Sequence, residues 1–385
     1  MTAKGVHITE ISRPQRYGDA RTTVRWTYDG SLNIRPEAFW VSPALKRPED
    51  EQSFALATLA PLAAAAGEVV TFPTPVDERV VEFWRVKLAG LSPFFKRPLA
   101  PRISPVASGM ADPPKRGDAA AILWGGGYDC LATLGRLMAR GIRPRMVRVH
   151  YAGYHLDLPS HVRYRLFGSL AEQESLIFAA PGTTSCPVQW NYRGEIGRFI
   201  EPAAMPAAGW PAASKNGRKV ADTLLYGFQL FFAAMAVLPD RVGRIYLASS
   251  LEDQGEPFGL GFNANNDADF FGLKMICEPW KTKVEQYHYL HHERPELVRW
   301  VKMCAGAHGK SQWCGHCHRC TLSHLLQLAA RVDEPITLRP DAGIIKTPFR
   351  LGYLKSAWEF YKAAGPVDEA VREAFGRHTV IKEWS

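Results

Sequence analysis

Four cysteines towards the end of the chain have the spacing of a metal site. The segment CAGAHGKSQWCGHCHRC contains Cys304 and then Cys314, Cys317 and Cys320, the last three in a CxxCxxC pattern. Two-residue spacing lets neighbouring thiolates converge on one ion, and a remote cysteine completes the tetrahedron. The pattern predicts a four-cysteine zinc site with a structural role, and an iron–sulfur cluster is the alternative. Three nearby histidines are competing ligands: His308, His316 and His318.

A glycine-rich corner is the second feature that could do chemistry. In AAILWGGGYDCLATLGRLMARG an apolar run is followed by Gly125, Gly126 and Gly127, and then by a helical pattern that contains Asp129 and Cys130. Glycine lets the backbone approach a ligand closely, and the first turn of a helix presents unpaired N–H groups. The corner therefore indicates an anion site or, alternatively, a tight turn in which Asp129 caps the helix.

Composition limits the class of protein. The 385 residues are 46% hydrophobic and 22% charged, which is typical of a globular chain with one large or two ordinary domains. The N-terminus lacks the basic and apolar run of a secretory signal, so we expect a cytoplasmic protein whose clustered cysteines bind metal. The net charge of +9 suits a polyphosphate ligand or a nucleic acid, but equally an ordinary basic protein.

The elements that must position these residues alternate between strand and helix after residue 118. Alternation of this kind predicts an α/β fold with a mostly parallel sheet, in which ligands bind at the carboxyl ends of strands. The apolar helix 220–238 contains Asp222 and Gln229 and is too short for a membrane span, so it is expected to be buried. The predicted strands are 120–124, 145–151 and 244–250, and the predicted helices are 128–141, with Gly141 as its stop, 166–180 and 220–238.

The first 115 residues have a different pattern. Runs rich in β-branched and aromatic residues at 22–30, 32–41 and 68–75 predict strands, and the spacing in 76–91 predicts a helix. The proline-rich segment 98–118 is interpreted as a linker. We therefore expect three parts: a β-rich N-terminal domain (1–115), an α/β domain with the cysteine site (116–330) and a helical C-terminal extension (331–385).

The two motifs together resemble the 7-cyano-7-deazaguanine synthases, a queuosine-biosynthesis branch of the PP-loop ATP pyrophosphatases. The resemblance covers roughly residues 118–328, and the ordinary synthases have no counterpart of the N-terminal third. It rests on the corner GGGYDC and the late CxxCxxC, and on four weaker matches in the same order. These matches are HYAGYH at 150–155, NGRK at 216–219, ASSLEDQGEPF at 248–258 and EPWKTKVEQ at 278–286.

The resemblance implies a Rossmann-like sheet of the adenine nucleotide α-hydrolase type with a C-terminal zinc knot. It implies a ligase that binds ATP and Mg²⁺, lets a carboxylate attack the α-phosphate and transfers the acyl group to an amine. Asp129, Lys283 and Arg218 would be catalytic, and Asp253, Phe258 and Lys283 would bind the substrate. The ATP loop would comprise Gly125, Gly126, Gly127, Tyr128, Asp129 and Cys130. Aromatic residues that could stack on a deazapurine are Tyr128, Phe258, Phe262 and Trp280, and each is also a candidate core residue.

The chain departs from the family pattern at three positions. The family loop reads SGGxDS, whereas here Gly125 and Cys130 replace the two serines, and His150 replaces an aspartate. Loss of a serine hydrogen bond to a charged phosphate would remove ~1.5–3 kcal/mol of binding free energy, although the backbone N–H donors of the loop are retained. A thiol at a helix N-terminus also raises the alternative of a nucleophilic Cys130.

Three functions remain open at this point. The first is activation of 7-carboxy-7-deazaguanine followed by transfer of the acyl group to an amine. The amine is ammonia in the synthases, and a protein amine in relatives with added domains from anti-phage defence islands. The extra N-terminal domain favours a protein acceptor. The second is a catalytically weakened protein that binds nucleotide or deazaguanine and serves as a partner. The third is a tRNA-modifying PP-loop enzyme, although we recognise no RNA-binding module, and we expect neither a nucleic-acid nor a membrane partner.

Overall fold

The computed structural model has two units, each built from several separate segments of the chain. The described residues are 5–12, 15–16, 19–29, 37–43, 69–78, 81–82, 85, 102–108, 117–151, 186–190, 242–248, 250, 252, 268–270, 273–278, 280–301, 313–346 and 348–381. They form two compact units: one from residues 1–123, 145–245 and 256–276, and one from 124–144, 246–255 and 277–385. The three-part division expected from the sequence stays a prediction.

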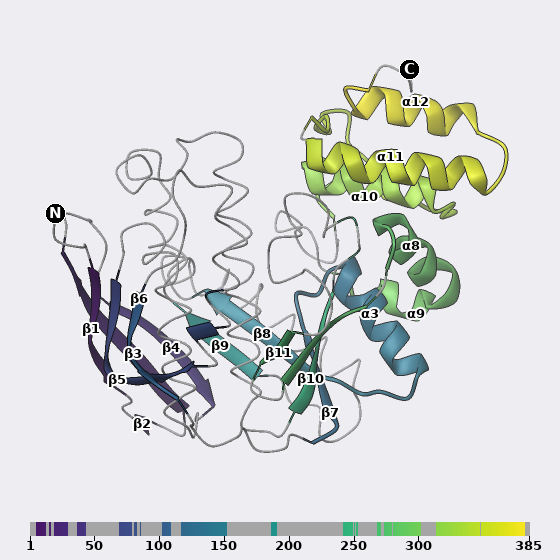
Figure 1. Cartoon of the computed structure of the whole chain (residues 1–385). Helices are drawn as coiled ribbons and strands as arrows, with labels where there is room; N and C mark the ends of the chain where they lie inside the picture. The colour runs from purple at the N-terminus through teal and green to yellow at the C-terminus, as the bar shows by residue number, and fades with distance from the viewer. Residues whose placement is uncertain are drawn as a thin grey trace. The chain divides into compact units, whose positions relative to one another are not determined.

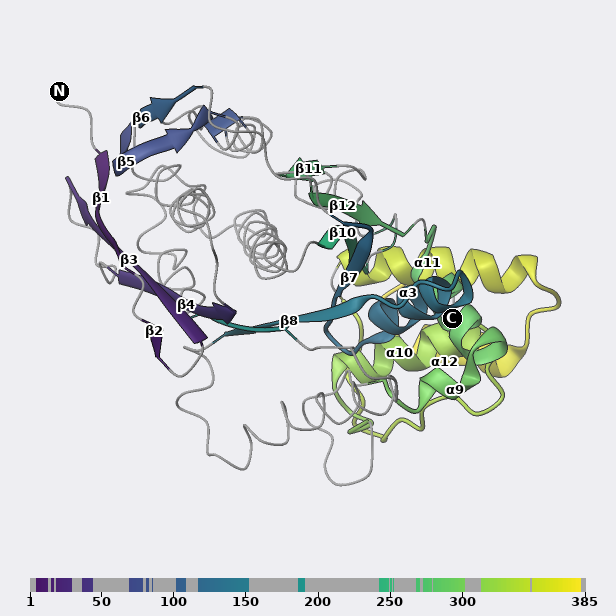
Figure 2. The same ribbon diagram turned by 90° about the horizontal axis from the view of Figure 1, so that it is seen from below.

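The first unit is built on a mixed sheet (Figures 1 and 2). Its order is β11-β12-β10-β7-β8-β9-β4-β3-β1-β5-β6, and β2 pairs with β3. The strands are β1 (Gly5–Ser12), β2 (Gln15–Arg16), β3 (Asp19–Tyr28), β4 (Glu37–Pro43), β5 (Val69–Asp77), β6 (Arg102–Ala107), β7 (Ala119–Leu123), β8 (Arg145–Tyr151), β9 (Cys186–Trp190), β10 (Val242–Leu247), β11 (Ala268–Phe270) and β12 (Leu273–Cys277).

Parallel pairing at the centre of this order confirms the predicted α/β class. β7 pairs in parallel with β8, with Ala121 opposite Arg145, and β8 pairs in parallel with β9, with Val147 opposite Cys186. Ala121 and Ile122 are fully buried, as expected of a strand covered on both faces. β4 then pairs antiparallel with β9, so the sheet continues into the N-terminal strands.

The segment interpreted as a linker contains a strand, which corrects that prediction. β6 pairs in parallel with β5, with Ile103 opposite Val70. Proline suggested a linker because it cannot donate to a strand ladder, but β6 lies at the end of the strand order, where a strand needs partners on one side only. Pro105 is therefore accommodated at an edge.

Several other predicted elements lie partly or wholly outside the described residues. The helices predicted at 166–180 and 220–238 are not among them. Of the helix predicted at 76–91, residues 78, 81, 82 and 85 are described and helical, but Val76 and Asp77 belong to strand β5, so the predicted start of the helix is wrong. The predicted strands at 22–30, 32–41 and 68–75 overlap β3, β4 and β5.

The described helices that belong to the second unit pack around α8 and α10. α8 packs against α3, α10 and α11, and α10 packs also against α12 (Figure 1). Among the described residues, no helix has both the length and the apolar character needed to cross a membrane. The helices are α3 (Tyr128–Ala139), α8 (Lys283–His288), the π-helix η5 (Tyr289–Glu293), α9 (Pro295–Val298), α10 (His318–Ala329), α11 (Pro348–Ala363) and α12 (Glu369–His378).

Candidate functional site

The three glycines form the turn that begins α3. Gly127 is the N-cap residue with extended backbone, and its carbonyl accepts the first helical hydrogen bond, from Leu131. Gly126 is buried with φ +71°, a left-handed conformation that residues with a Cβ seldom adopt. Gly141, with φ +73°, follows the end of the helix as predicted. The cap is therefore the glycine backbone and not the side chain of Asp129.

The amides of this turn converge on the sulfur of Cys130. Gly125 N–H donates to Sγ at 3.2 Å. Burial raises the pKa of the Cys130 thiol to about 11, and the amides of Gly125, Gly127 and Gly126 partly offset the rise because they stabilise the thiolate. Convergence of successive N–H groups on one atom is the geometry of an anion-binding nest. Burial outweighs the helix N-terminus here, so Cys130 is not an activated nucleophile.

The geometry of the turn predicts different effects on the free energy of unfolding for two adjacent alanine substitutions. Gly126→Ala is expected to destabilise the protein by about 1–2 kcal/mol, the cost of a left-handed non-glycine residue. Gly125→Ala is the control, because a Cβ there would meet only Cys130 Sγ, at 3.8 Å. Urea unfolding of the two variants measures the difference, and equal losses would contradict the geometry of the turn.

The raised pKa predicts slow alkylation of Cys130. At pH 8 a thiol with pKa about 11 holds about 100-fold less thiolate than one with the ordinary value of 9.0, so iodoacetamide should label it correspondingly slowly. Because the folded-state pKa is raised, the protonated thiol stabilises the fold below pH 9 and this contribution is lost as the pH rises towards 11. Peptide mass spectrometry measures the labelling rate, and rapid labelling of the folded protein at pH 8 would refute the prediction.

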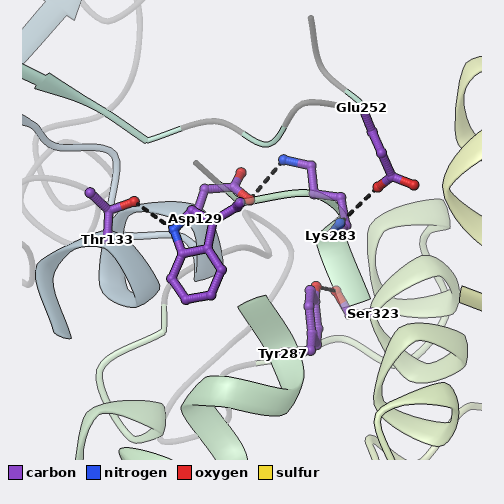
Figure 3. Close-up of polar contacts among 7 residues, drawn as sticks. Asp129, Thr133, Glu252, Lys283, Tyr287 and Ser323 are labelled. Carbon is purple, nitrogen blue, oxygen red and sulfur yellow. Dashed lines mark hydrogen bonds and ion pairs between the residues drawn. The ribbon is translucent and has the colours of Figure 1, made fainter. Parts of the chain in front are cut away.

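The structure brings together Asp129 and Lys283, two of the three predicted catalytic residues. Lys283 Nζ lies 2.7 Å from Asp129 Oδ1, although the residues are 154 positions apart (Figure 3). Asp129 lies in the first turn of α3, where a negative charge is favourable, and Lys283 begins α8. The Lys283 side chain is only 13% exposed and that of Asp129 33%, so water screens the pair only in part.

Two further residues hold Lys283 in place. Glu252 Oε2 accepts a hydrogen bond from the Lys283 backbone N–H at 2.7 Å (Figure 3). The ring of Tyr353, from α11, lies 5.6 Å from Nζ in cation–π geometry and is buried. Sequence reasoning missed both residues: Glu252 is adjacent to the predicted Asp253, whereas nothing in the local sequence connects α11 with Lys283.

Glu285, which matched the family pattern, has a local role. Thr282 is the N-cap of α8 and its hydroxyl accepts from Glu285 N–H, while Glu285 Oε2 accepts from Lys281 N–H. These reciprocal bonds resemble a capping box. The run KTKVE therefore fixes the start of the helix at which Lys283 lies.

Two of the aromatic candidates for a purine pocket are core residues. Tyr128 is 2% exposed and Trp280 1%. Trp280 Nε1 donates to Thr133 at 3.3 Å, and the Arg136 guanidinium lies 3.5 Å from the centre of the indole ring. Their described contacts are with protein side chains, so these rings support the site and offer no free face in the described structure.

Three of the four predicted metal ligands form a cluster. The Sγ atoms of Cys314, Cys317 and Cys320 lie within 4.8 Å of one another, and Cys320 Sγ is 3.6 Å from each of the other two. Tetrahedral bonds of roughly 2.3 Å to zinc would place sulfurs roughly 3.8 Å apart, so the cluster fits a metal ion such as zinc. Cys314 and Cys320 are buried.

The turn of the cluster is held by a later segment. Arg339 N–H donates to Gly315 O, and Gly343 N–H donates to His316 O. The ring of His318 packs so close to Gly343 that a Cβ there would lie 2.9 Å from it. Within the described residues, the group that could hold a metal consists of the three cysteines and includes neither His316 nor His318.

Six predicted site residues are not among those that the structure describes. Outside the described residues lie Arg218, Asp253, Phe258, Phe262, Cys304 and His308. The backbone of His150 belongs to β8, but its side chain is not described.

Comparison with known proteins identifies no family. No protein-family model matches the sequence, and no curated protein is significantly similar to it.

Proposed function

We propose that this protein is an ATP-dependent ligase that activates a carboxylate as an acyl adenylate and transfers it to an amine. The proposal is supported most by one observation, the nest of glycine amides at the start of α3 beside the Asp129–Lys283 pair. The glycine amides at the start of α3 and the ammonium group of Lys283, which lies beside Asp129, suit a polyphosphate because they offset its negative charge. Asp129 would supply a carboxylate oxygen of the kind that Mg²⁺ prefers, and the ion would help to offset the charge of the phosphates.

The proposed reaction has two steps. A carboxylate oxygen attacks the α-phosphorus of ATP, the bond to the β-phosphate breaks, and pyrophosphate leaves. The amine nitrogen then attacks the acyl carbon, the bond between this carbon and the bridging oxygen breaks, and AMP leaves with that oxygen, which came from the carboxylate. The nitrogen loses a proton. The glycine amides and Lys283 stabilise the charge that develops on the phosphates during the first step.

The substrate is proposed from the resemblance of the motifs. 7-Carboxy-7-deazaguanine is the acid of the synthases that GGGYDC and CxxCxxC resemble, and a Rossmann-like sheet of the α-hydrolase type agrees with parallel β7–β8–β9. The N-terminal third has no counterpart in those synthases, which favours a protein amine over ammonia as acceptor and a role in anti-phage defence. Zinc would be held by Cys314, Cys317 and Cys320, with Cys304 as the fourth ligand and no open position for catalysis.

The direct test follows pyrophosphate. The full chain is incubated with ATP, Mg²⁺ and 7-carboxy-7-deazaguanine, with ammonia or candidate partner proteins as acceptors. We expect pyrophosphate and AMP in equal amounts and a mass increase on the acceptor. Absence of pyrophosphate with every acceptor would refute the proposed activity.

A catalytically weakened nucleotide-binding protein is the second candidate, and Cys130 favours it. Its sulfur accepts a hydrogen bond from the Gly125 N–H, a donor that a bound phosphate would otherwise use. The double variant Gly125→Ser, Cys130→Ser separates the two functions. If the native protein binds ATP without turnover and the double variant releases pyrophosphate, the second candidate is correct.

A further inference from the structure

Two stacked tyrosines lie on the same two helices as the Asp129–Lys283 pair. Tyr128 precedes Asp129 on α3, and Tyr287 follows Lys283 by one helical turn on α8. The two rings stack with centroids 3.7 Å apart and planes 15° apart, and each is 2% exposed. The two helices that carry the ion pair are therefore in contact through adjacent side chains.

Helix α10 holds both tyrosines by their hydroxyl groups. Ser323 Oγ lies 2.9 Å from the Tyr287 hydroxyl (Figure 3), and Gln327 Nε2 donates to the Tyr128 hydroxyl at 2.7 Å. Ser323 and Gln327 are four residues apart and so lie on one face of α10. The Gln327 carbonyl oxygen accepts from Ile336 N–H at 2.7 Å, which fixes the orientation of the amide.

A buried histidine completes the connection. His291 Nε2 lies 3.0 Å from the Tyr128 hydroxyl. Burial lowers the pKa of His291 to about 4, so the ring is neutral at pH 7 and Nε2 can accept the hydroxyl proton. The Tyr128 hydroxyl thus accepts from Gln327 and donates to His291, and burial makes these bonds costly to lose.

The same helix begins in the cysteine cluster. Cys317 is the N-cap of α10, and Cys320 lies in its first turn, one turn before Ser323. A metal held by these cysteines would fix the start of α10. Ser323 and Gln327 would then hold the two tyrosines at a defined height relative to the cluster.

We propose that Tyr287 and Gln327 are positioning residues, which transmit the position of α10 from the cysteine cluster to the Asp129–Lys283 pair. A metal held by the three cysteines would then affect the geometry of the Asp129–Lys283 pair through these residues, without contact to the substrate. This rests on the proposed function only for its catalytic consequence, because the positioning itself is a property of the folded chain.

The test measures the reactivity of Lys283 and needs no nucleotide. Full-length zinc-loaded protein is labelled with an amine-acylating reagent, and peptide mass spectrometry gives the rate at Lys283. Tyr287→Leu removes ring and hydroxyl and should raise the rate at least about 5-fold, because labelling of a protected amine follows its local opening. Tyr287→Phe keeps the ring and should raise it less, as should Gln327→Leu.

Two controls separate positioning from general destabilisation. Phe375→Leu removes another fully buried ring of the second unit, which packs against Trp358, and should leave Lys283 labelling unchanged. The exposed Lys281 reports reagent reactivity in every variant. Equal increases in Phe375→Leu and Tyr287→Leu, or none in the three test variants, would overturn the proposal.

Metal removal tests the connection to the cluster. A chelator should raise Lys283 labelling in the native chain but add little in Tyr287→Leu, because both changes break one path. Additive effects would overturn the proposal. A protein that shows the coupled pattern but releases no pyrophosphate would retain this inference and refute the proposed function.

Discussion

Replacement of Lys283 by methionine is expected to lower the rate of pyrophosphate release roughly 100- to 1,000-fold, the range for loss of one preorganised charge-stabilising group. Methionine keeps most of the side-chain volume but removes the ammonium that lies 2.7 Å from Asp129 Oδ1. It also leaves Asp129 without this positive partner beside bound phosphates. Steady-state pyrophosphate assays measure the effect, which should fall on kcat/KM.

The neighbouring Lys281 is a matched control. It lies two residues away and its side chain is exposed, so Lys281→Met should retain the native rate within a factor of about 2, as expected for a surface substitution. If both variants were equally impaired, the loss would come from charge or folding in general. If neither were impaired, Lys283 would have no part in the chemistry.

Removal of the metal should have the largest effect on stability. Cys320 is fully buried, and its sulfur lies 3.6 Å from those of Cys314 and Cys317, so the empty cluster would leave three close thiols with no shared ion. Structural zinc contributes folding free energy directly. We expect chelation, or Cys320→Ser, to lower the Tm by roughly 6–12 °C, as follows from ~3 kcal/mol in a unit of this size.

Cys130 provides the control for that experiment. Its thiol lies in the glycine turn and is not part of the cysteine cluster, so Cys130→Ser should retain the native zinc content. Metal analysis of the purified protein gives the stoichiometry. A native chain that contains no zinc, or a Cys320→Ser variant with unchanged Tm and zinc content, would contradict the assignment of the cluster.

Local patterns predicted the parts of the site that depend on adjacent residues. Three glycines before a helical period indicated the turn at Gly126, because few other residues accept φ +71°. The CxxCxxC spacing predicted the cluster for the same reason, since two-residue separations fix how thiolates can converge. Cys130 was predicted only in part, because the helix terminus was visible in sequence whereas the burial that raises its pKa was not.

Contacts between distant segments were beyond sequence reasoning. That Asp129 and Lys283 belong to one site was predicted only through the motif resemblance, because the two residues are 154 positions apart and meet only in the packed unit. Tyr353 lies on another helix, α11, and had no signal at all in the local sequence. β6 was missed since Pro105 suggests a loop unless the strand is known to lie at an edge.

The fate of the carboxylate oxygen tests the central claim most directly. 7-Carboxy-7-deazaguanine labelled with heavy oxygen in its carboxylate is incubated with the full chain, ATP, Mg²⁺ and an amine acceptor, and the AMP is analysed by mass spectrometry. Because the acyl adenylate shares one carboxylate oxygen with the α-phosphate, we predict one heavy oxygen in each AMP released with product. AMP that carries only light oxygen would show that water or another group attacked the phosphate, and would contradict carboxylate activation by this protein.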